Sequence, residues 1–268
     1  MKKRWTLLLL AGLAAWVFWA NTAIEVNEWT VASERLPAAF EGFRIAQVSD
    51  LHNAQFGPEN ETLLGLLKKA EPDIIVITGD LVDSGKTDVA LALDFAAKAV
   101  QIAPCYYVSG NHEANSGQWT QLRQGLLDAG VLVLEDEGVL LEREGEHILL
   151  FGLQDPAFGG DIVGNLNRLK EEEGYTVLLS HRPELFGGYV NAGIDLVFSG
   201  HAHGGQLRIP FVGGLVAPGQ GFFPEYDSGL YQRNGTAMLV SRGLGNSIIP
   251  LRVNNRPEIL VAVLKRSQ

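Results

Sequence analysis

A pair of histidines stands directly behind an apolar run in the second half of the sequence. The run 195–200 (DLVFSG) has the composition of a buried strand that ends at a serine and a glycine, and His201 and His203 follow with one residue between them. Imidazole nitrogens bind divalent cations and carry protons near neutral pH. The pair therefore indicates a metal site or an acid–base site at the end of a strand.

Four other apolar runs end in the same way, in a small residue followed by a side chain that can bind a metal or carry a proton. These side chains are, in chain order, Asp50 and His52, Asp80, Asn111 and His112, and His181. A single case is usually a turn former or a helix cap, but turn formation does not explain five such ends. Because ligands in α/β sheets bind beyond the carboxyl ends of the strands, we expect all these side chains to lie close together. The remaining histidine, His147, follows no such run and is expected on the surface of a strand.

The types of donor atom narrow the choice of metal. Carboxylate, amide and imidazole donors are present, and the only cysteine, Cys105, lies in the apolar run 103–108, where we expect it to be buried. Such donors suit divalent ions of intermediate hardness, with Mn²⁺ as the expected metal and Fe²⁺ or Zn²⁺ as alternatives. The donors are too numerous for one ion and about sufficient for two, which a carboxylate can bridge.

The elements that position these side chains alternate along the chain. Strands and helices in alternation predict parallel pairing with right-handed crossovers, whereas the segment 130–153 has three short apolar runs without a helix and predicts an antiparallel meander. We expect an α/β fold of two mixed sheets packed face to face with helices outside. The expected strands cover 25–33, 43–50, 72–80, 104–111, 175–181, 195–201, 236–243 and 258–265, and the expected helices cover 58–70, 88–100, 118–130 and 161–173.

The first 24 residues form a segment of their own. The cations Lys2, Lys3 and Arg4 precede a run without charge that extends to Ile24. As a helix, residues 5–24 would be about 30 Å long, which matches the hydrocarbon core of a bilayer. We interpret 1–24 as an uncleaved membrane anchor or a signal sequence and 25–268 as one mixed α/β domain. The positive charges would stay in the cytoplasm and place that domain on the extracytoplasmic side of the cell membrane.

Five blocks of the sequence resemble those of the calcineurin-like metallophosphoesterase superfamily, in the same order. They are DLH (50–52), GDLVDSG (79–85), GNHE (110–113), SHRP (180–183) and GHAH (200–203). The resemblance implies a four-layer α/β sandwich with a dinuclear metal centre. It implies one metal held by Asp50, His52 and His203, another held by Asn111, His181 and His201, Asp80 as the bridge, and His112 as a catalytic residue that faces the phosphate without binding metal.

The resemblance also implies a reaction. A hydroxide shared by the two ions would form near neutral pH and attack a phosphoester in line, while His112 donates a proton to the leaving oxygen or stabilises the transition state. The N-terminal hydrophobic segment and the run 200–210 resemble the membrane-associated bacterial branch of the superfamily. That branch includes phosphodiesterases and pyrophosphohydrolases of UDP-diacylglucosamine, so the expected substrate is a lipid-linked or envelope phosphoester. Lipid A precursors that bear UDP lie on the cytoplasmic face, which conflicts with the side expected from the positive charges.

Two alternatives stay open at this point. The chain could be a nucleotidase or protein phosphatase of the same superfamily, or a metal-binding scaffold without catalysis, although a scaffold has no use for His112. A net charge of −10 argues against nucleic acid as a partner.

Several other residues are weaker candidates for the site. Asp83 and Glu113 could orient the metal ligands or only bond to their own loops, and Arg208 and Arg242 could grip a second phosphate. The stretch 219–231 (GQGFFPEYDSGLY) could form a lipid-facing lip or plug the end of the sheet.

Overall fold

The first sheet is built from the N-terminal strands and the C-terminal strand of the chain. The computed structural model describes residues 2–246 and 251–267, so the predicted outer limits at residues 1 and 268 lie outside the described residues. Strand β16 lies antiparallel to β2 and parallel to β1, and β2 to β5 are parallel to one another. In spatial order the strands are β1 (Glu25–Ser33), β16 (Glu258–Arg266), β2 (Arg44–Val48), β3 (Ile74–Thr78), β4 (Cys105–Val108) and β5 (Leu132–Val133).

The second sheet also has six strands. Its four inner strands are parallel, and an antiparallel strand lies at each edge. In spatial order the strands are β14 (Gly229–Arg233), β15 (Thr236–Val240), β9 (Leu196–Ser199), β8 (Thr176–Leu179), β7 (Glu146–Gly152) and β6 (Glu137–Arg143). The predicted pair of mixed sheets flanked by helices is therefore what the structure shows.

The prediction of a three-stranded meander over 130–153 is wrong in its first strand. Only β6 and β7 form an antiparallel hairpin, whereas Leu132 and Val133 of β5 pair in parallel with Tyr106 and Tyr107 of β4 in the other sheet. The helix that precedes β5 carries the chain back along the first sheet, and Val133 is buried there. The sequence pattern shows that 132–133 is a strand but not which sheet receives it.

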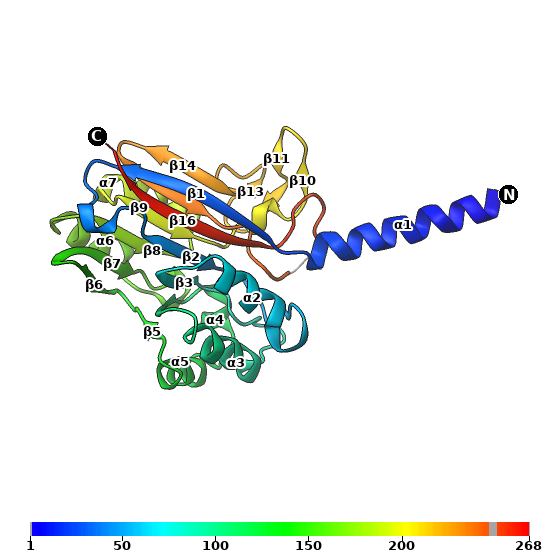
Figure 1. Ribbon diagram of the computed structural model, residues 1–268, viewed down its shortest axis with the longest axis horizontal. Helices are drawn as coiled ribbons and strands as arrows, with labels where there is room; N and C mark the ends of the chain where they lie inside the picture. Colours follow the sequence, from blue (N-terminus) through cyan, green and yellow to red (C-terminus); the bar gives the residue numbers. More distant parts are fainter. Residues whose placement is uncertain (1, 247–250, 268) are drawn as a thin grey trace.

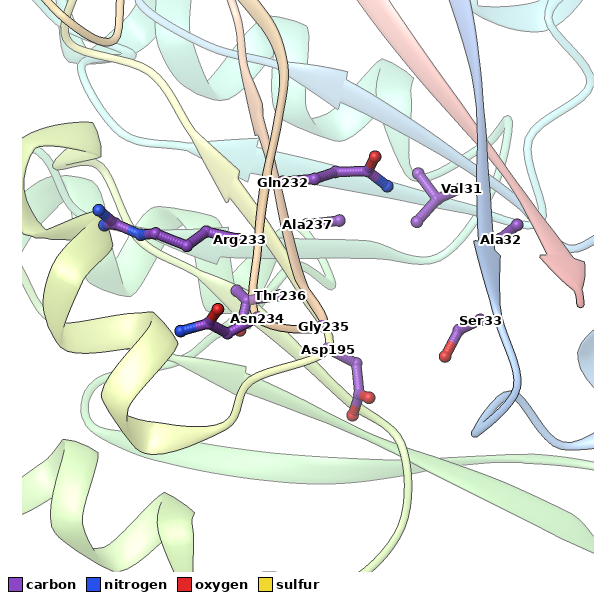
Figure 2. Close-up of a pocket in the computed structure, with 10 residues that line it drawn as sticks. All are labelled: Val31, Ala32, Ser33, Asp195, Gln232, Arg233, Asn234, Gly235, Thr236 and Ala237. Atoms are coloured by element: carbon purple, nitrogen blue, oxygen red, sulfur yellow. The ribbon is translucent and has the colours of Figure 1, made fainter.

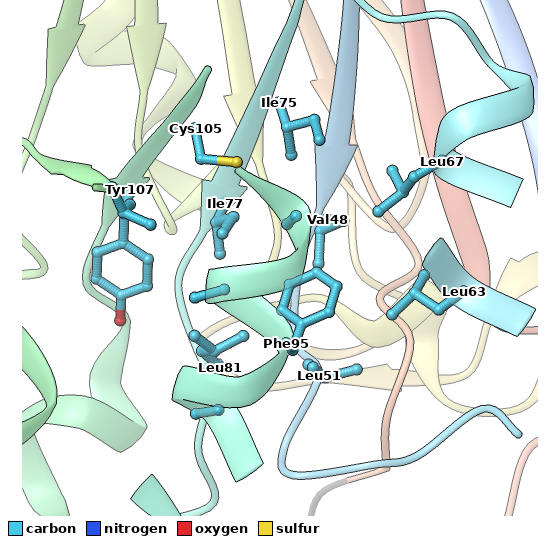
Figure 3. Close-up of a cluster of buried hydrophobic side chains, with 14 of the residues drawn as sticks. Val48, Leu51, Leu63, Leu67, Ile75, Ile77, Leu81, Phe95, Cys105 and Tyr107 are labelled. Atoms are coloured by element: carbon cyan, nitrogen blue, oxygen red, sulfur yellow. The ribbon is translucent and has the colours of Figure 1, made fainter. Parts of the chain in front are cut away.

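Two groups of helices cover the outer faces of the sheets (Figure 1). Helices α2 (Glu61–Lys69), α3 (Val89–Ala99) and α5 (Trp119–Asp128) pack on the first sheet, and α6 (Ile162–Lys170) and α7 (Phe186–Ala192) pack on the second. Figure 3 shows Leu63 and Leu67 of α2 and Phe95 of α3 against the strands of the first sheet. A separate apolar cluster fills the space between the sheets. The molecule thus has four layers.

Cys105 and His147 lie where the sequence predicts. Cys105 is 1% exposed within the layer between α3 and the first sheet (Figure 3), and burial raises the pKa of its thiol to about 12. His147 is exposed on β7. Neither residue belongs to the group of side chains at the strand ends.

Helix α1 (Lys2–Thr22) projects from the body of the molecule (Figure 1). The side chain of Asn21 donates to the carbonyl of Arg252 and accepts from its N–H. The Arg256 guanidinium lies 4.5 Å from the centre of the Trp19 ring and donates to the carbonyl of Ala23. Within residues 2–246 and 251–267, no helix has both the length and the apolar character needed to cross a membrane.

Short elements complete the fold. Two small hairpins, β10–β11 and β12–β13, follow the GHAH block. Their strands are β10 (Arg208–Ile209), β11 (Gly213–Gly214), β12 (Val216–Ala217) and β13 (Gly221–Phe222). The other elements are the short helix α4 (Asn111–Asn115) and 3₁₀ turns at Ala38–Phe40, Pro58–Asn60, Pro156–Phe158, Pro183–Leu185 and His203–Gly205.

Candidate metal centre

The carboxyl ends of β2, β3, β4, β8 and β9 meet at one edge of the two facing sheets. The structure brings together there three metal-binding side chains from the first sheet, three from the second, and the ring of His112 in α4. They are Asp50, His52, Asp80, His112, His181, His201 and His203. Asn111 opens α4 directly before His112. The two aspartates and the four strand-end histidines are at most 7% exposed.

One group of donor atoms consists of Asp50, His52, Asp80 and His203. The Nε2 atoms of His52 and His203 are 3.2 Å apart. The Oδ1 atom of Asp50 lies 3.3 Å from His203 Nε2, and the Oδ2 atom of Asp80 lies 3.7 Å from His52 Nε2. One donor atom from each of the four residues lies within 4.8 Å of the others, which is the spacing of atoms around a single cation.

A second group shares Asp80 with the first. The Oδ2 atom of Asp80 lies 3.1 Å from His181 Nε2, which is 3.2 Å from His201 Nδ1. The other nitrogen of His181, Nδ1, is 2.7 Å from the carbonyl of Thr78 and donates to it, which directs Nε2 toward Asp80. The buried Oδ1 atom of Asn111 has no hydrogen-bond partner within the described part of the chain.

The backbone at these strand ends is strained. Asp50, His52, Asp80, His201 and His203 all have positive φ, between 47° and 65°. This left-handed region costs a residue with a Cβ atom about 1–2 kcal/mol. Strain of this kind persists where the surrounding structure holds it, and it clusters at functional sites.

Two glycines allow the polar side chains to approach so closely. A Cβ atom on Gly110 would lie 2.3 Å from Asp80 Oδ1, and one on Gly200 would lie 1.9 Å from Ser49 Oγ and 2.4 Å from Asp50 Oδ2. The glycines that end the apolar runs are therefore required by the contact between the strand ends.

Asp80 and His181 form a buried charge pair. Burial raises the pKa of Asp80, but the charge of His181 and its hydrogen bond outweigh burial and hold the pKa well below the usual range. Burial lowers the pKa of His181, but the charge and hydrogen bond of Asp80 outweigh it and raise the pKa to about 10. A cation bound beside Asp80 would take the place of this proton.

The other strand-end histidines are held neutral. Burial lowers the pKa of His52 to about 4 and of His201 to about 2, and it lowers the pKa of His203 well below the usual value. Neutral imidazole is the form that binds a metal. Together with the unpartnered Oδ1 of Asn111, these nitrogens fit a site for divalent cations of intermediate hardness.

His112 lies beside the first group and is oriented by its neighbours. The N–H of Ser84 donates to His112 Nδ1 at 3.0 Å, so in the neutral ring the proton is on Nε2. The N–H of His112 donates to Asp80 Oδ1 at 2.8 Å, and its ring stands edge-on to that of His52 with 4.5 Å between the centroids. A proton carrier is thereby fixed next to the metal-binding groups.

Glu113 holds the loop that carries Asp80. One carboxylate oxygen accepts from the N–H of Leu81 and Val82, and the other accepts from the N–H of Asp80 and Gly110. The carboxylate of Asp83 is less directly involved. Its Oδ2 atom is 3.7 Å from His52 Nδ1, which is too long for a hydrogen bond, and its Oδ1 atom accepts from the N–H of Gly85 and Lys86.

Two arginines support the centre and were missed from the sequence. Arg182 makes a two-point pair with Asp155 and places Nη1 2.9 Å from His201 Nε2. Arg252, which is fully buried, donates to the carbonyl of Gly245, and the N–H of Gly245 donates to the carbonyl of Asp50. Arg182 belongs to the SHRP block, so the sequence could have indicated its role. No pattern in the neighbouring residues indicates a role for Arg252.

The prediction that Arg208 and Arg242 grip a second phosphate is not supported by their contacts. Arg208 Nη1 lies 3.1 Å from a carboxylate oxygen of Asp227, and Arg242 pairs with Glu25 and Glu258. Both guanidinium groups are therefore neutralised by nearby carboxylates.

Within the stretch 219–231, one aromatic side chain packs on the second sheet and two others are exposed. The ring of Tyr226 is buried and packs edge-on against Phe186 and Tyr231, so this part plugs the end of the sheet. Phe222 and Phe223 are 75% and 61% exposed.

A separate pocket lies at the other end of the strands. Figure 2 shows this pocket, which has a volume of about 300 Å³ and is lined by Ser33, Asp195 and Asn234 among others. Asp195 precedes β9, whereas the metal-binding groups follow it. Its carboxylate already accepts from the N–H of Thr176 and pairs with Arg35 at 3.0 Å, so the pocket takes no part in the centre.

Known proteins are similar to this chain in sequence. Residues 43–205 match the family described as calcineurin-like phosphoesterase. The chain is 34% identical to the metallophosphoesterase YkuE of Bacillus subtilis over 90% of this chain and 86% of that protein. It is 30% identical to the phosphodiesterase YaeI of Escherichia coli over 83% and 82% of the two chains. It is also 30% identical to a transmembrane protein with a metallophosphoesterase domain from Danio rerio, over 91% of this chain and 58% of that protein.

Proposed function

The chain belongs to the calcineurin-like phosphoesterase family and is a metal-dependent phosphoester hydrolase, and on that premise we propose that it uses two metal ions to hydrolyse phosphodiester or pyrophosphate bonds. The Asp80 carboxylate carries this proposal, because it belongs to both groups of donor atoms. The proposed ligands are Asp50, His52 and His203 for one ion, Asn111, His181 and His201 for the other, and Asp80 for both.

When bound, two divalent ions, Mn²⁺ as the expected pair, would supply the positive charge that activates water and offsets the charge of the phosphoryl oxygens. The protein supplies orientation. Thr78 fixes the ring of His181, and Glu113 fixes the backbone of Asp80. The strained backbone at Asp50 and Asp80 directs both carboxylates into the centre.

His112 is the proposed proton donor. Its Nδ1 atom accepts from the N–H of Ser84, so in the neutral ring Nε2 is the donor that would hydrogen-bond to the leaving oxygen of the substrate. A positioned histidine of this kind contributes about 10²–10⁴ in rate. A scaffold that only binds metal would not require this orientation, which favours the hydrolase over the scaffold.

The test is turnover of a soluble chromogenic phosphodiester by the full chain in detergent, after loading with Mn²⁺. We expect turnover that disappears with chelator and returns with metal. A nucleotide monoester and a phosphopeptide, assayed in parallel, distinguish a phosphodiesterase from a nucleotidase or a protein phosphatase. Absence of turnover with every substrate in the metal-loaded protein would contradict the proposal.

We also infer that α1 attaches the hydrolase to a membrane and that the substrate is a lipid-linked or envelope phosphoester on the extracytoplasmic side. The similarity to a protein named as transmembrane supports membrane attachment. The exposed apolar side chains of α1 support it as well, among them Trp5 at 65% and Leu9 at 74% exposure. The positions of Lys2, Lys3 and Arg4 support the extracytoplasmic side.

Flotation of the full chain with lipid vesicles tests the attachment. We expect the chain to float with vesicles and the variant Leu9→Glu/Leu13→Glu to float less, because both side chains are more than half exposed on α1. Equal flotation of the two proteins would count against attachment through α1.

A further inference from the structure

A second apolar surface lies beside the metal-binding groups and is separate from α1. It is the segment 208–223, which contains the two small hairpins and is called here the aromatic lip. Phe211 is fully exposed, Phe222 is 75% exposed and Phe223 is 61% exposed, and Val212 is exposed to a similar extent. Exposed phenyl rings in such a group mark a surface that contacts another apolar phase.

The charge of this region is unlike that of the rest of the molecule. The chain has a net charge of −10, yet residues 204–224 contain no carboxylate and only one cation, Arg208. Arg208 is paired with Asp227, which lies outside the segment. Residues 1–24 likewise contain no carboxylate and carry Lys2, Lys3 and Arg4. The apolar surfaces of this acidic protein are therefore the parts that an anionic lipid surface would not repel.

The aromatic lip is joined directly to the metal-binding groups. It follows His203 after four residues, and Gly205 packs so tightly on Gly214 that a Cβ atom on Gly205 would lie 2.2 Å from the Cα atom of Gly214. A Cβ atom on Gly219 would lie 3.7 Å from His201 Nε2. The lip therefore forms part of the surroundings of the second group of donors.

The lip is also joined to the base of α1. The N–H of Arg208 donates to the carbonyl of Val253, and Leu207 forms an isolated β-bridge with the same residue. The neighbouring residue, Arg252, makes two hydrogen bonds with Asn21 at the end of α1. Figure 1 shows β10, β11 and β13 at the end of the molecule from which α1 departs.

We propose that the aromatic lip inserts into the surface of a lipid bilayer and holds the metal centre against the headgroups, so that the enzyme acts on phosphoesters presented at the lipid–water interface. The inference rests on the proposed function, because it names where that hydrolysis takes place. It does not require α1 to do more than attach the protein, since the lip itself sets the distance between the centre and the membrane. Exposed aromatic rings suit the headgroup level of a bilayer.

The first experiment separates the lip from the chemistry. The full chain and its variant Phe211→Ala/Phe222→Ala/Phe223→Ala are reconstituted with vesicles of phosphatidylethanolamine and phosphatidylglycerol. Turnover is measured on a soluble phosphodiester and on the same phosphodiester carried by a two-chain lipid. We expect the variant to retain turnover of the soluble substrate and to lose about tenfold or more on the lipid-borne one, because its rings no longer enter the interface.

The matched control is Leu140→Ala/Val163→Ala, which removes two exposed apolar side chains from β6 and α6, away from the metal-binding groups. We expect the control to match the unmodified chain on both substrates. Equal turnover of the lipid-borne substrate by the lip variant and the control would overturn the inference. Failure of the unmodified chain to hydrolyse the soluble substrate would instead overturn the proposed function.

The second experiment measures insertion directly. A fluorophore sensitive to polarity is attached at Phe222→Cys, with Leu140→Cys as the control, while Cys105 stays unlabelled because it is buried and its pKa is raised to about 12. Vesicles should shift the emission at position 222 to the blue, and spin-labelled lipid should quench it, with neither effect at position 140. A blue shift without vesicles that grows with protein concentration would show a second copy of the chain as the occupant and overturn the inference.

Discussion

At the scale of single residues, Asp80 connects the two halves of the centre. Its Oδ2 atom faces His52 on one side and His181 on the other, while its Oδ1 atom accepts from the N–H of His112. No other carboxylate among the described residues belongs to both groups of donors. Changes at this residue should therefore affect both metal positions together.

The substitution Asp80→Asn tests this. An amide is neutral and its oxygen is a weaker ligand than a carboxylate oxygen, so it holds two cations less well than a carboxylate does. We expect metal content, measured by elemental analysis of the purified protein, to fall from about two ions per chain to less than one, with turnover falling at least about 10²-fold. The comparison variant Asp50→Asn should lose about one ion. Loss of a single ion from Asp80→Asn would count against its bridging role.

The role of His112 predicts a different result. The variant His112→Asn should keep its full metal content, because the proposed ligands remain, but its turnover should fall by about 10²–10⁴. The loss should be smaller for a substrate whose leaving group is so acidic that it needs no proton. A parallel decrease in metal content and turnover would show that His112 is a ligand.

The proposed ligands could be predicted from the sequence because each follows its own strand closely. Asp50 and His201 illustrate this, since each stands within two residues of an apolar run that ends in a small residue. The supporting residues were not accessible in this way. Arg252 is linked to Asp50 through Gly245, and this contact is made by the folded chain and not by a local pattern.

At the scale of elements, α4 and the loop after β3 form one unit through Glu113. Its two carboxylate oxygens accept four backbone N–H groups, and the residue is fully buried. The sequence left Glu113 open as a residue that could orient the ligands or only bond to its own loop. The contacts show that it does both, because one of its donors is the backbone of Asp80.

The substitution Glu113→Gln should therefore destabilise the protein without removing any proposed ligand. Either orientation of the amide would place an NH₂ group against two backbone N–H donors. We expect a loss of about 1–3 kcal/mol in the free energy of unfolding, measured with denaturant, because buried donors lose their acceptor. The control Glu172→Gln changes an exposed side chain and should have almost no effect. Equal stability of the two variants would contradict the account of this loop.

The positions of strands and helices were predicted well where the spacing of apolar residues was clear. The sheet that a strand joins was predicted less well, because the neighbouring residues do not determine it. The prediction placed strands and helices near their observed positions from β1 to α5. It failed at β5, where two apolar residues gave no indication that they would join β4 and not β6. The pairing partner depends on the crossover of α5, which is a property of the tertiary fold.

At the scale of the whole molecule, the centre lies between the two sheets. Asp50 and Asp80 come from the first sheet, whereas His181, His201 and His203 come from the second. A polar contact already joins the sheets there, because the side chain of Gln47 donates to Thr78 Oγ1 and to the carbonyl of Ser199. Cations held by both sheets would join them further, so metal binding and folding should be linked.

This linkage predicts how stability depends on metal. A ligand that binds only the folded chain stabilises it by about 2.7 kcal/mol at 100 times its dissociation constant, which for a protein of this size raises the melting temperature by roughly 5–10 °C. We expect such a rise when Mn²⁺ is added to the chelator-treated chain, measured by calorimetry. Asp80→Asn should show much less of it, because neither group of donors is then complete. His112→Asn should show all of it, since a proton donor that binds no metal does not contribute to the linkage. An equal rise in Asp80→Asn would mean that the added metal binds elsewhere and that the two sheets are not joined through this centre.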